Sequence, residues 1–481
     1  MITFSIALLT LIAGYFIYGR FVERVFGPDP NREAPAISKA DGVDYILLPS
    51  WKIFMIQFLN IAGLGPIFGA IMGAQYGTAS YLWIVLGTIF AGAVHDFFGG
   101  ALSIRHDGES LPQIVGRYLG NSTQKLMMAF SVVLLVLVAA VFVSGPAELL
   151  AGMTSGVSFM NPMFWIVVIF CYYVLATLCP VDKIIGKVYP LFAVALLFMA
   201  MGLLVMLFVK HPDLPEMWES FGTKYDPNPI FPMMFVSIAC GAISGFHATQ
   251  SPMMARCMKS EKLCRPIFYG AMVTEGIVAL IWAAVATYFF AENGTVDADG
   301  KAFSGAMVAT QISKDWLGTV GGVLALLGIV FAPITSGDTA LRSARLMVSD
   351  FLRIQQKSVV RRLLVSIPLF LVTIAILFWS LEDANGFKII WRYFAWCNQT
   401  LSVFTLWAIT VYLVWKKKLY WVTLIPALFM TVVCSTYILA APEGLSLEGS
   451  LPYILGGACG LLAVIWFTTW KIRDKKFYEK N

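Results

Sequence analysis

The chain has 481 residues, of which 59% are hydrophobic and only 13% are charged, so it is too apolar for a soluble protein. Soluble domains carry roughly 25% charged residues. In this chain charged residues are scarce because long apolar runs contain few of them, and such runs are typical of membrane-spanning helices. The net charge of +6 does not indicate a nucleic-acid partner, because excess Lys and Arg in a membrane protein mark its cytoplasmic loops.

Thirteen apolar runs predict an all-α polytopic membrane protein with about thirteen transmembrane helices. The runs cover residues 2–18, 53–76, 80–104, 124–150, 162–180, 187–209, 230–255, 266–291, 317–340, 362–380, 393–414, 419–440 and 451–470. The longest segments between them, 19–52, 210–229 and 292–316, are expected to be loops. Each is too short to form a soluble domain with its own core.

The basic residues predict the orientation of these helices. No basic residue precedes the first run and no small-residue cleavage site follows it, so we expect a retained first helix rather than a signal peptide. If the N-terminus lies outside, 28 of the 34 Lys and Arg residues fall on the cytoplasmic side. An odd number of helices then places the C-terminus in the cytoplasm.

Two of the runs contain glycine and proline that should interrupt a helix. The second run contains Gly63-Leu-Gly-Pro66, and the seventh contains Gly241-Ala-Ile-Ser-Gly245. Both stretches begin roughly 15 Å into their runs, which is the middle of a hydrocarbon core of about 30 Å. Broken helices are tolerated at this depth where they are buried or line a polar cavity. For the glycines between Gly65 and Gly77, close helix packing is the alternative interpretation.

The two predicted breaks are five helices apart, so the helices that contain them run in opposite directions. This arrangement predicts a 5+5 inverted repeat, residues 53–209 and 230–414, with a binding site at the midplane between the breaks. Residues 1–52 would form a peripheral first helix and a cytoplasmic loop. Residues 415–481 would form two trailing helices and a cytoplasmic tail.

Four stretches resemble the carbon starvation protein A (CstA) family, namely residues 63–70, 180–190, 240–247 and 335–345. The resemblance runs across most of the chain. It implies a carrier of the bacterial inner membrane that takes up peptides, or pyruvate together with protons. The 5+5 arrangement also resembles the LeuT-like fold.

The breaks suggest where a substrate would bind. The N-terminus of a half-helix presents free backbone N–H groups and a positive dipole end, which suit a carboxylate. Pyruvate and the C-terminus of a peptide both carry a carboxylate. The expected substrate-binding residues are Gln57, Asn60, Gly63, Gly65, Ser244, Gly245, His247 and Gln250.

Ionisable side chains inside the apolar runs are costly in lipid and are therefore functional candidates. The candidates for proton coupling are His95, Asp96, Lys187, His247 and Glu275. His247 either carries a proton or caps a half-helix. His95 and Asp96 form either a proton relay or a polar pair that anchors its helix to Arg105. Local pairing with neighbouring groups is expected for Glu148 and Asp338.

Similarity to the LeuT-like fold further implies a Na⁺ site. Its oxygen ligands would come from Leu59, Ala62, Ala332, Thr335 and Ser336. In proton-coupled carriers of this fold a lysine replaces the ion, and Lys187 could reach that place unless it extends to the membrane surface instead. The hydroxyls favour Na⁺ and the family favours H⁺, so the coupling ion stays open. No other cofactor is expected.

These features predict a secondary active transporter that takes up a small carboxylate-bearing nutrient with H⁺ or Na⁺. The expected partners are this small molecule and the lipid bilayer, and the oligomeric state is open. The alternatives are an ion or solute channel and a sodium-coupled amino-acid transporter. A channel would favour symmetric pore rings, and an enzyme is disfavoured because neither a His-Glu-x-x-His nor a Gly-x-Ser-x-Gly motif occurs.

Overall fold

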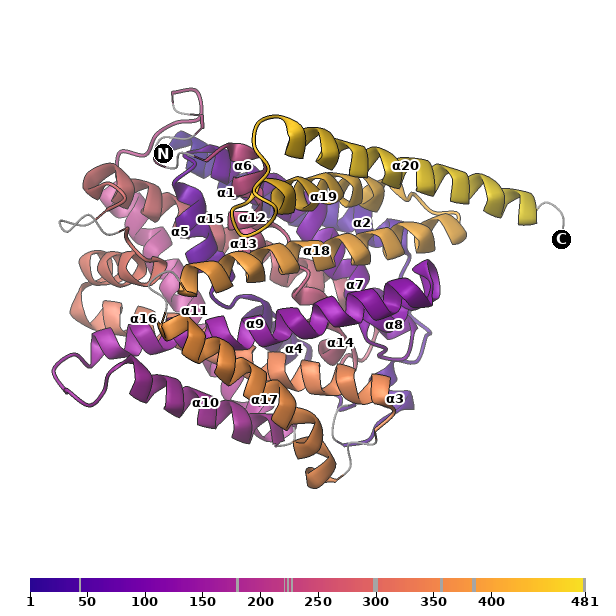
Figure 1. Cartoon of the computed structure of the whole chain (residues 1–481), viewed down its shortest axis with the longest axis horizontal. Coiled ribbons are helices and arrows are strands. Elements are labelled where there is room, and N and C mark those ends of the chain that lie inside the picture. Colours follow the sequence, from indigo (N-terminus) through magenta and orange to yellow (C-terminus); the bar gives the residue numbers. More distant parts are fainter. Residues whose placement is uncertain are drawn as a thin grey trace.

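The computed structural model describes residues 1–42, 45–178, 181–219, 221–222, 225, 228–296, 302–354, 358–382 and 386–478. These ranges form a bundle of helices, the longest of which run in similar directions (Figure 1). Ten helices of the described chain are long and apolar enough to cross a membrane, or eleven if one bent pair counts as a single span. The chain is therefore a polytopic membrane protein.

The helices of the N-terminal part are α1 (Ile2–Phe16), α2 (Tyr18–Phe26), α3 (Pro35–Ser38), α4 (Ser50–Ile61), α5 (Ala70–Ala74), α6 (Ala79–Gly87), α7 (Ala93–Arg105), α8 (Leu111–Leu119), α9 (Asn121–Met153), α10 (Pro162–Leu178) and α11 (Val181–Lys210). Those of the C-terminal part are α12 (Phe235–Ser237), α13 (Ala239–Ala242), α14 (His247–Ala255), α15 (Gly270–Asn293), α16 (Gly305–Leu352), α17 (Val359–Glu382), α18 (Gly386–Trp415), α19 (Trp421–Ala440) and α20 (Leu451–Tyr478). Short π-helical or 3₁₀ segments join some of them, namely η1 (Gly65–Gly69), η2 (Thr88–Gly92), η3 (Ile230–Met234), η4 (Glu261–Leu263) and η5 (Arg265–Tyr269).

The predicted number of thirteen spans stays a prediction. The expected span 162–180 is the 17-residue helix α10, which is shorter than the ten helices above. The expected loop 292–316 was wrong in part, because α16 already begins at Gly305. Gly318 (φ +68°) kinks α16 between this first segment and the apolar part, since glycine adopts a left-handed conformation without strain.

The helices pack around the segments that contain the two expected breaks. α16 lies along α9 and α11, α18 contacts both α9 and α19, and α1 lies against α15 at the edge of the bundle. The N-terminus and the far end of α20 lie at opposite ends of the bundle (Figure 1). At the end of α7, Arg105 binds Glu261 through two guanidinium nitrogens, each at 3.1 Å. The Arg105 guanidinium also lies 3.7 Å from the ring centre of Phe26. This contact attaches the end of α2 to the end of α7.

Candidate substrate and coupling site

The first predicted break is present at the end of α4. This helix ends at Ile61, Ala62 has non-helical angles (φ −81°, ψ 52°), and the segment from Gly65 to Ala74 continues at an angle of 54°. The Gly63 N–H turns back to the Ile61 carbonyl at 2.9 Å. The break is buried throughout, as non-helical backbone inside a membrane must be.

The second predicted break lies between α13 and α14, and an asparagine of α18 holds it. Ile243 is extended (φ −156°, ψ 142°). Oδ1 of Asn398 accepts hydrogen bonds from the Phe246 N–H at 2.6 Å and from the Ser244 hydroxyl at 3.0 Å. The Asn398 carbonyl accepts the Gly245 N–H at 3.0 Å. These bonds satisfy polar groups that lipid could not satisfy.

The two broken helices touch each other through glycines of the first. A Cβ atom at Gly65 would lie 2.3 Å from the Cβ of Cys240 in α13. Gly69 and Gly73 likewise face residues 237–238. This part of the glycine stretch is therefore a close-packing surface between helices. Gly65 contacts the neighbouring helix rather than an open site.

Gly65→Ala is expected to force the two broken helices apart and to lower stability by about 1–3 kcal/mol, the usual cost of overpacking. Adding Cys240→Gly should restore part of the loss, because it removes the atoms nearest to the new methyl group. Thermal unfolding of the purified variants measures both effects. Gly99→Ala is the matched control, since nothing lies within 4 Å of a Cβ at Gly99. Equal unfolding temperatures for the two alanine variants would contradict the close contact.

The other backbone donors that were expected to bind substrate are already engaged. The Gly63 N–H is bonded within its break, and the Gly245 N–H is bonded to Asn398. A Cβ at Gly63 would lie 2.6 Å from the Phe142 ring, and one at Gly245 would lie 2.3 Å from the Asn398 carbonyl oxygen. The Ser244 hydroxyl also donates to Asn398. These residues shape the breaks, and their role in substrate binding stays a prediction.

Three of the expected substrate-binding side chains are fully buried and incompletely bonded. Both amide atoms of Asn60, Oε1 of Gln57 and Oε1 of Gln250 have no hydrogen-bond partner in the described chain. Gln57 Nε2 approaches Ser251 Oγ at 3.5 Å, and Gln250 Nε2 donates to Thr249 at 2.8 Å. Buried amides are normally bonded, so the remaining atoms are available to a small polar ligand or to water.

Four of the five predicted coupling residues form one buried group, called the His–Asp–His–Glu cluster below. Its members are His95 and Asp96 of α7, His247 of α14 and Glu275 of α15. Nδ1 of His95 and Nδ1 of His247 each lie 2.8 Å from a different oxygen of Asp96. Nε2 of His247 lies 3.3 Å from an oxygen of Glu275. All four side chains are at most 1% exposed.

This cluster can hold and pass a proton. An ionised Asp96 accepts N–H bonds from both imidazoles, so Nδ1 carries a hydrogen in each ring and Nε2 stays free to take another. In His247 this Nε2 faces Glu275, whose oxygens have no partner with hydrogen-bond geometry within the described ranges. A buried imidazole beside a carboxylate has two protonation states of different charge, which is the chemistry that proton coupling requires.

The residues expected to bind Na⁺ also lie together, beside the first break. The Ser336 hydroxyl oxygen lies 3.0 Å from the carbonyl oxygens of both Leu59 and Ala332. The Thr335 hydroxyl oxygen lies 2.8 Å from the same Ala332 carbonyl. Ala62 follows at the end of α4. These uncharged oxygens are of the kind that hard cations prefer, so the donor set fits a monovalent cation.

Two further predictions concern Lys187 and the role of His95 and Asp96. Lys187 belongs to α11, but its side chain lies outside the described residues. The interpretation that His95 and Asp96 anchor α7 to Arg105 is wrong, because Arg105 pairs with Glu261 while Asp96 binds the two imidazoles.

The structure also places the two acidic residues whose roles the sequence left open. Oδ2 of Asp338 accepts hydrogen bonds from Tyr189 at 2.6 Å and Tyr172 at 2.8 Å. Its donors are thus tyrosines of α11 and α10 rather than the arginines that follow it in sequence. Glu148 accepts a hydrogen bond from Ser304 at 3.4 Å.

Sequence reasoning missed the amides of α18. Asn398 holds the second break, and Gln399 Nε2 donates to the Ala239 carbonyl at 3.0 Å just before it. The only signal was two adjacent amide residues inside the apolar run 393–414. Such residues in a membrane helix usually bond a neighbouring helix, but the sequence does not say which one.

A membrane bundle in which two broken helices meet beside a buried ionisable cluster is typical of a transporter. The fold is shared with solved transporters. The chain resembles a manganese transporter of Eremococcus coleocola with a TM-score of 0.59 at 12% identity, over 91% of this chain and 99% of that one. It resembles a Na⁺-coupled sialic acid symporter with a TM-score of 0.52 at 14% identity, over 96% of each chain. At these identities the likeness concerns the fold alone.

The chain belongs to the family of the carbon starvation protein CstA, whose model matches residues 1–160, 152–310 and 290–437. It is 25% identical to the peptide transporter CstA of Campylobacter jejuni, over 99% of this chain and 84% of that protein. It is also 25% identical to the pyruvate/proton symporter BtsT of Escherichia coli, over 92% of this chain and 81% of that protein. An uncharacterized membrane protein of Haemophilus influenzae is 43% identical over 60% of this chain and 91% of its own length.

Proposed function

We propose that this chain is a secondary active transporter that takes up a small carboxylate-bearing nutrient, a short peptide or pyruvate, together with protons. The observation that carries the proposal is the position of His247. Its imidazole belongs to the His–Asp–His–Glu cluster, and its backbone begins the half-helix that follows the second break. A proton on the cluster and a substrate at the break would both act on this residue, so that each changes the affinity for the other. The names of two relatives, a peptide transporter and a pyruvate/proton symporter, support the same function.

The substrate would be recognised by the incompletely bonded amides. Asn60 offers a donor and an acceptor, and the free Oε1 atoms of Gln57 and Gln250 offer two more acceptors. A protonated His247 would add a positive charge that favours a carboxylate. A buried polar site of this kind rejects ligands that leave its groups unpaired, which makes it selective for small polar molecules.

We further propose that the transporter lies in the inner membrane of a bacterium, with the N-terminus outside and the C-terminus in the cytoplasm. The excess of basic residues in alternate loops supports this orientation. The 5+5 division into residues 53–209 and 230–414 is supported by one break near the start of each half. Residues 1–52 and 415–481 would flank this core.

Na⁺ is the second candidate for the coupling ion. It is favoured by the oxygen atoms of Leu59, Ala332, Thr335 and Ser336 beside the first break, each of which lies within hydrogen-bond distance of at least one of the others. When bound, the ion would supply a positive charge there and replace the hydroxyl bonds that now satisfy the carbonyls.

Uptake by the purified protein in proteoliposomes tests both candidates. We expect labelled pyruvate or a labelled dipeptide to accumulate when the vesicle interior is alkaline, and a Na⁺ gradient alone to drive no accumulation. Accumulation under the Na⁺ gradient alone would assign coupling to the oxygen cluster instead. Flux without accumulation would indicate a channel. If neither substrate accumulates under either gradient, the proposed function is wrong.

A further inference from the structure

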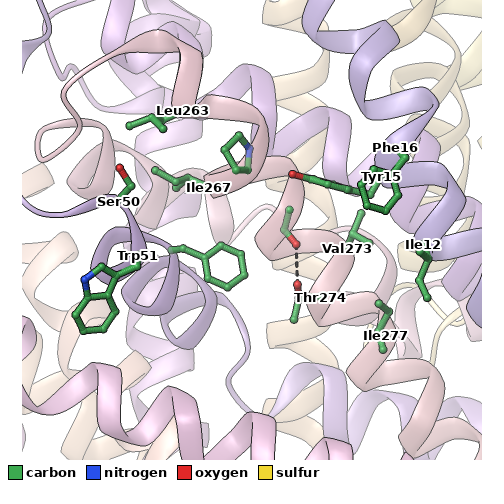
Figure 2. Close-up of a pocket in the computed structure, with 13 residues that line it drawn as sticks. Ile12, Tyr15, Phe16, Ser50, Trp51, Leu263, Ile267, Val273, Thr274 and Ile277 are labelled. Atoms are coloured by element: carbon green, nitrogen blue, oxygen red, sulfur yellow. Dashed lines mark hydrogen bonds between the residues drawn. The ribbon is translucent and has the colours of Figure 1, made fainter.

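A cavity of about 540 Å³ lies on the side of the bundle between α1, α4 and α15, away from the breaks. Its walls are largely apolar and include Tyr15, Trp51, Phe54 and Ile277. Trp51 is 58% exposed, so the cavity opens to the surroundings of the helices. Figure 2 shows Trp51 at one end of the cavity and Ile277 at the other. Its size is that of an ordinary small-molecule site.

The dimensions and the lining of the cavity suit a lipid tail. From Ile267 to Ile277 the wall extends ten residues, or roughly 15 Å, which is the depth of one leaflet of a hydrocarbon core of about 30 Å. The Thr274 hydroxyl in this wall is already bonded to the Gly270 carbonyl at 2.9 Å (Figure 2). Along this wall an apolar chain leaves no hydrogen-bonding group of Thr274 unsatisfied.

Two lysines lie next in sequence to residues at one end of the cavity. Ser50 and Leu263 lie at this end (Figure 2). Lys52 comes two residues after Ser50, next to the lining residue Trp51, and Lys262 directly precedes Leu263. In the described chain neither lysine has an ion pair, and Lys52 has only the face of the Trp51 ring at 5.7 Å. A lysine near a membrane surface favours an anionic lipid by about fivefold.

We propose that this cavity binds the acyl chain of an anionic phospholipid whose headgroup is held by Lys52 and Lys262. The site is suited to regulation because of the helices that form it. Thr274 directly precedes Glu275 of the His–Asp–His–Glu cluster, and Phe54 lies one helical turn before Gln57. A lipid tail in the cavity therefore touches both the helix that carries the cluster and the helix that leads to the first break. Its effect on transport rests on the proposed function, whereas its binding does not.

Photo-crosslinking tests the binding. The purified protein is placed in phosphatidylcholine nanodiscs that contain either phosphatidylglycerol or phosphatidylcholine with a photoreactive acyl chain, and the labelled peptides are identified by mass spectrometry. We expect phosphatidylglycerol to label residues 12–16, 51–54 and 267–277 in preference to the lipid-exposed helix α20. Lys52→Gln combined with Lys262→Gln should lower this labelling about tenfold or more, since two favourable charges are lost. Lys416→Gln combined with Lys417→Gln makes the same change of charge elsewhere and should leave it unchanged.

A variant that fills the cavity separates the tail site from the headgroup site. Thr274→Trp should abolish labelling of these segments by either probe, because the indole takes the place of the acyl chain. Equal labelling by the two probes in the wild type, or labelling no stronger than that of α20, would overturn the proposal. Uptake of labelled pyruvate in vesicles with and without phosphatidylglycerol is the second measurement, and the lysine variant should lose the stimulation. If the wild type transports nothing, the proposed function fails while the labelling still decides the lipid site.

Discussion

Asp96→Asn is expected to abolish proton-driven accumulation of substrate. Asp96 is the centre of the His–Asp–His–Glu cluster, with an imidazole nitrogen 2.8 Å from each of its oxygens. Asparagine keeps the shape of the side chain but carries no charge, so a proton bound at either imidazole would be buried without a balancing anion from this residue. A pH gradient should then no longer drive the site. Uptake of labelled pyruvate by proteoliposomes with an alkaline interior measures the loss.

A counterflow assay distinguishes loss of coupling from loss of folding. In this assay both sides have the same pH, so the Asp96→Asn variant should still exchange labelled for unlabelled substrate. Asp107→Asn is the matched control, because Asp107 lies just beyond the opposite end of α7, where it pairs with the exposed Lys39 at 3.3 Å. If Asp96→Asn accumulates substrate as well as Asp107→Asn does, the cluster is not the proton site.

The two histidines of the cluster should differ in their importance. His247 contacts Asp96 and Glu275, whereas His95 contacts Asp96 alone. His247→Gln therefore interrupts the path from one carboxylate to the other, and His95→Gln removes only one end of it. A larger loss of accumulation for His95→Gln would mean that the proton enters from the side of His95.

The sequence was sufficient to predict the membrane fold and the two breaks, because these signals come from residue types alone and do not depend on tertiary contacts. Glycine and proline interrupt a helix by their own geometry, so Gly63 and Gly245 could be placed without knowledge of any neighbour. The cost of charge in lipid likewise identified His95, Asp96, His247 and Glu275 one by one. That these four form one cluster was not predictable, because α7, α14 and α15 meet only through the tertiary packing of the bundle.

Tertiary packing also decided where the predictions failed or stayed incomplete. Gly65 was expected to bind substrate, which stays a prediction, and the structure shows it packed closely against Cys240, since a glycine serves close helix packing as well as it serves a break. Asp338 was expected to pair locally, and the charge of Arg342 does act on it, but its hydrogen bonds come from two tyrosines of other helices. Asn398 was missed because an amide in an apolar run shows only that some polar partner exists, and here that partner lies more than 150 residues away.

Asn398→Ala is expected to destabilise the second break and to stop both accumulation and counterflow. The substitution leaves the Phe246 N–H and the Ser244 hydroxyl buried without their acceptor. Each unsatisfied donor costs about 1–3 kcal/mol, so the total loss is about 2–6 kcal/mol. The same asparagine also lies against Cys240 through its Nδ2 atom, at 3.3 Å, so both ends of the break lose support. Thermal unfolding of the purified protein and counterflow measure the two effects.

Two further variants test whether the lost hydrogen bonds are the cause. Thr400→Ala is the matched control on the same helix, because the Thr400 hydroxyl donates to the Trp396 carbonyl of its own helix and takes no part in the break, so its loss should change little. Ser244→Ala removes one of the two donors that Asn398→Ala leaves unsatisfied, so the double variant should be less destabilised than the sum of the single variants. Strictly additive losses would show that Asn398 acts through packing alone. In contrast to Asp96→Asn, which should spare exchange, Asn398→Ala should lose exchange together with coupling, because the break positions His247 for both.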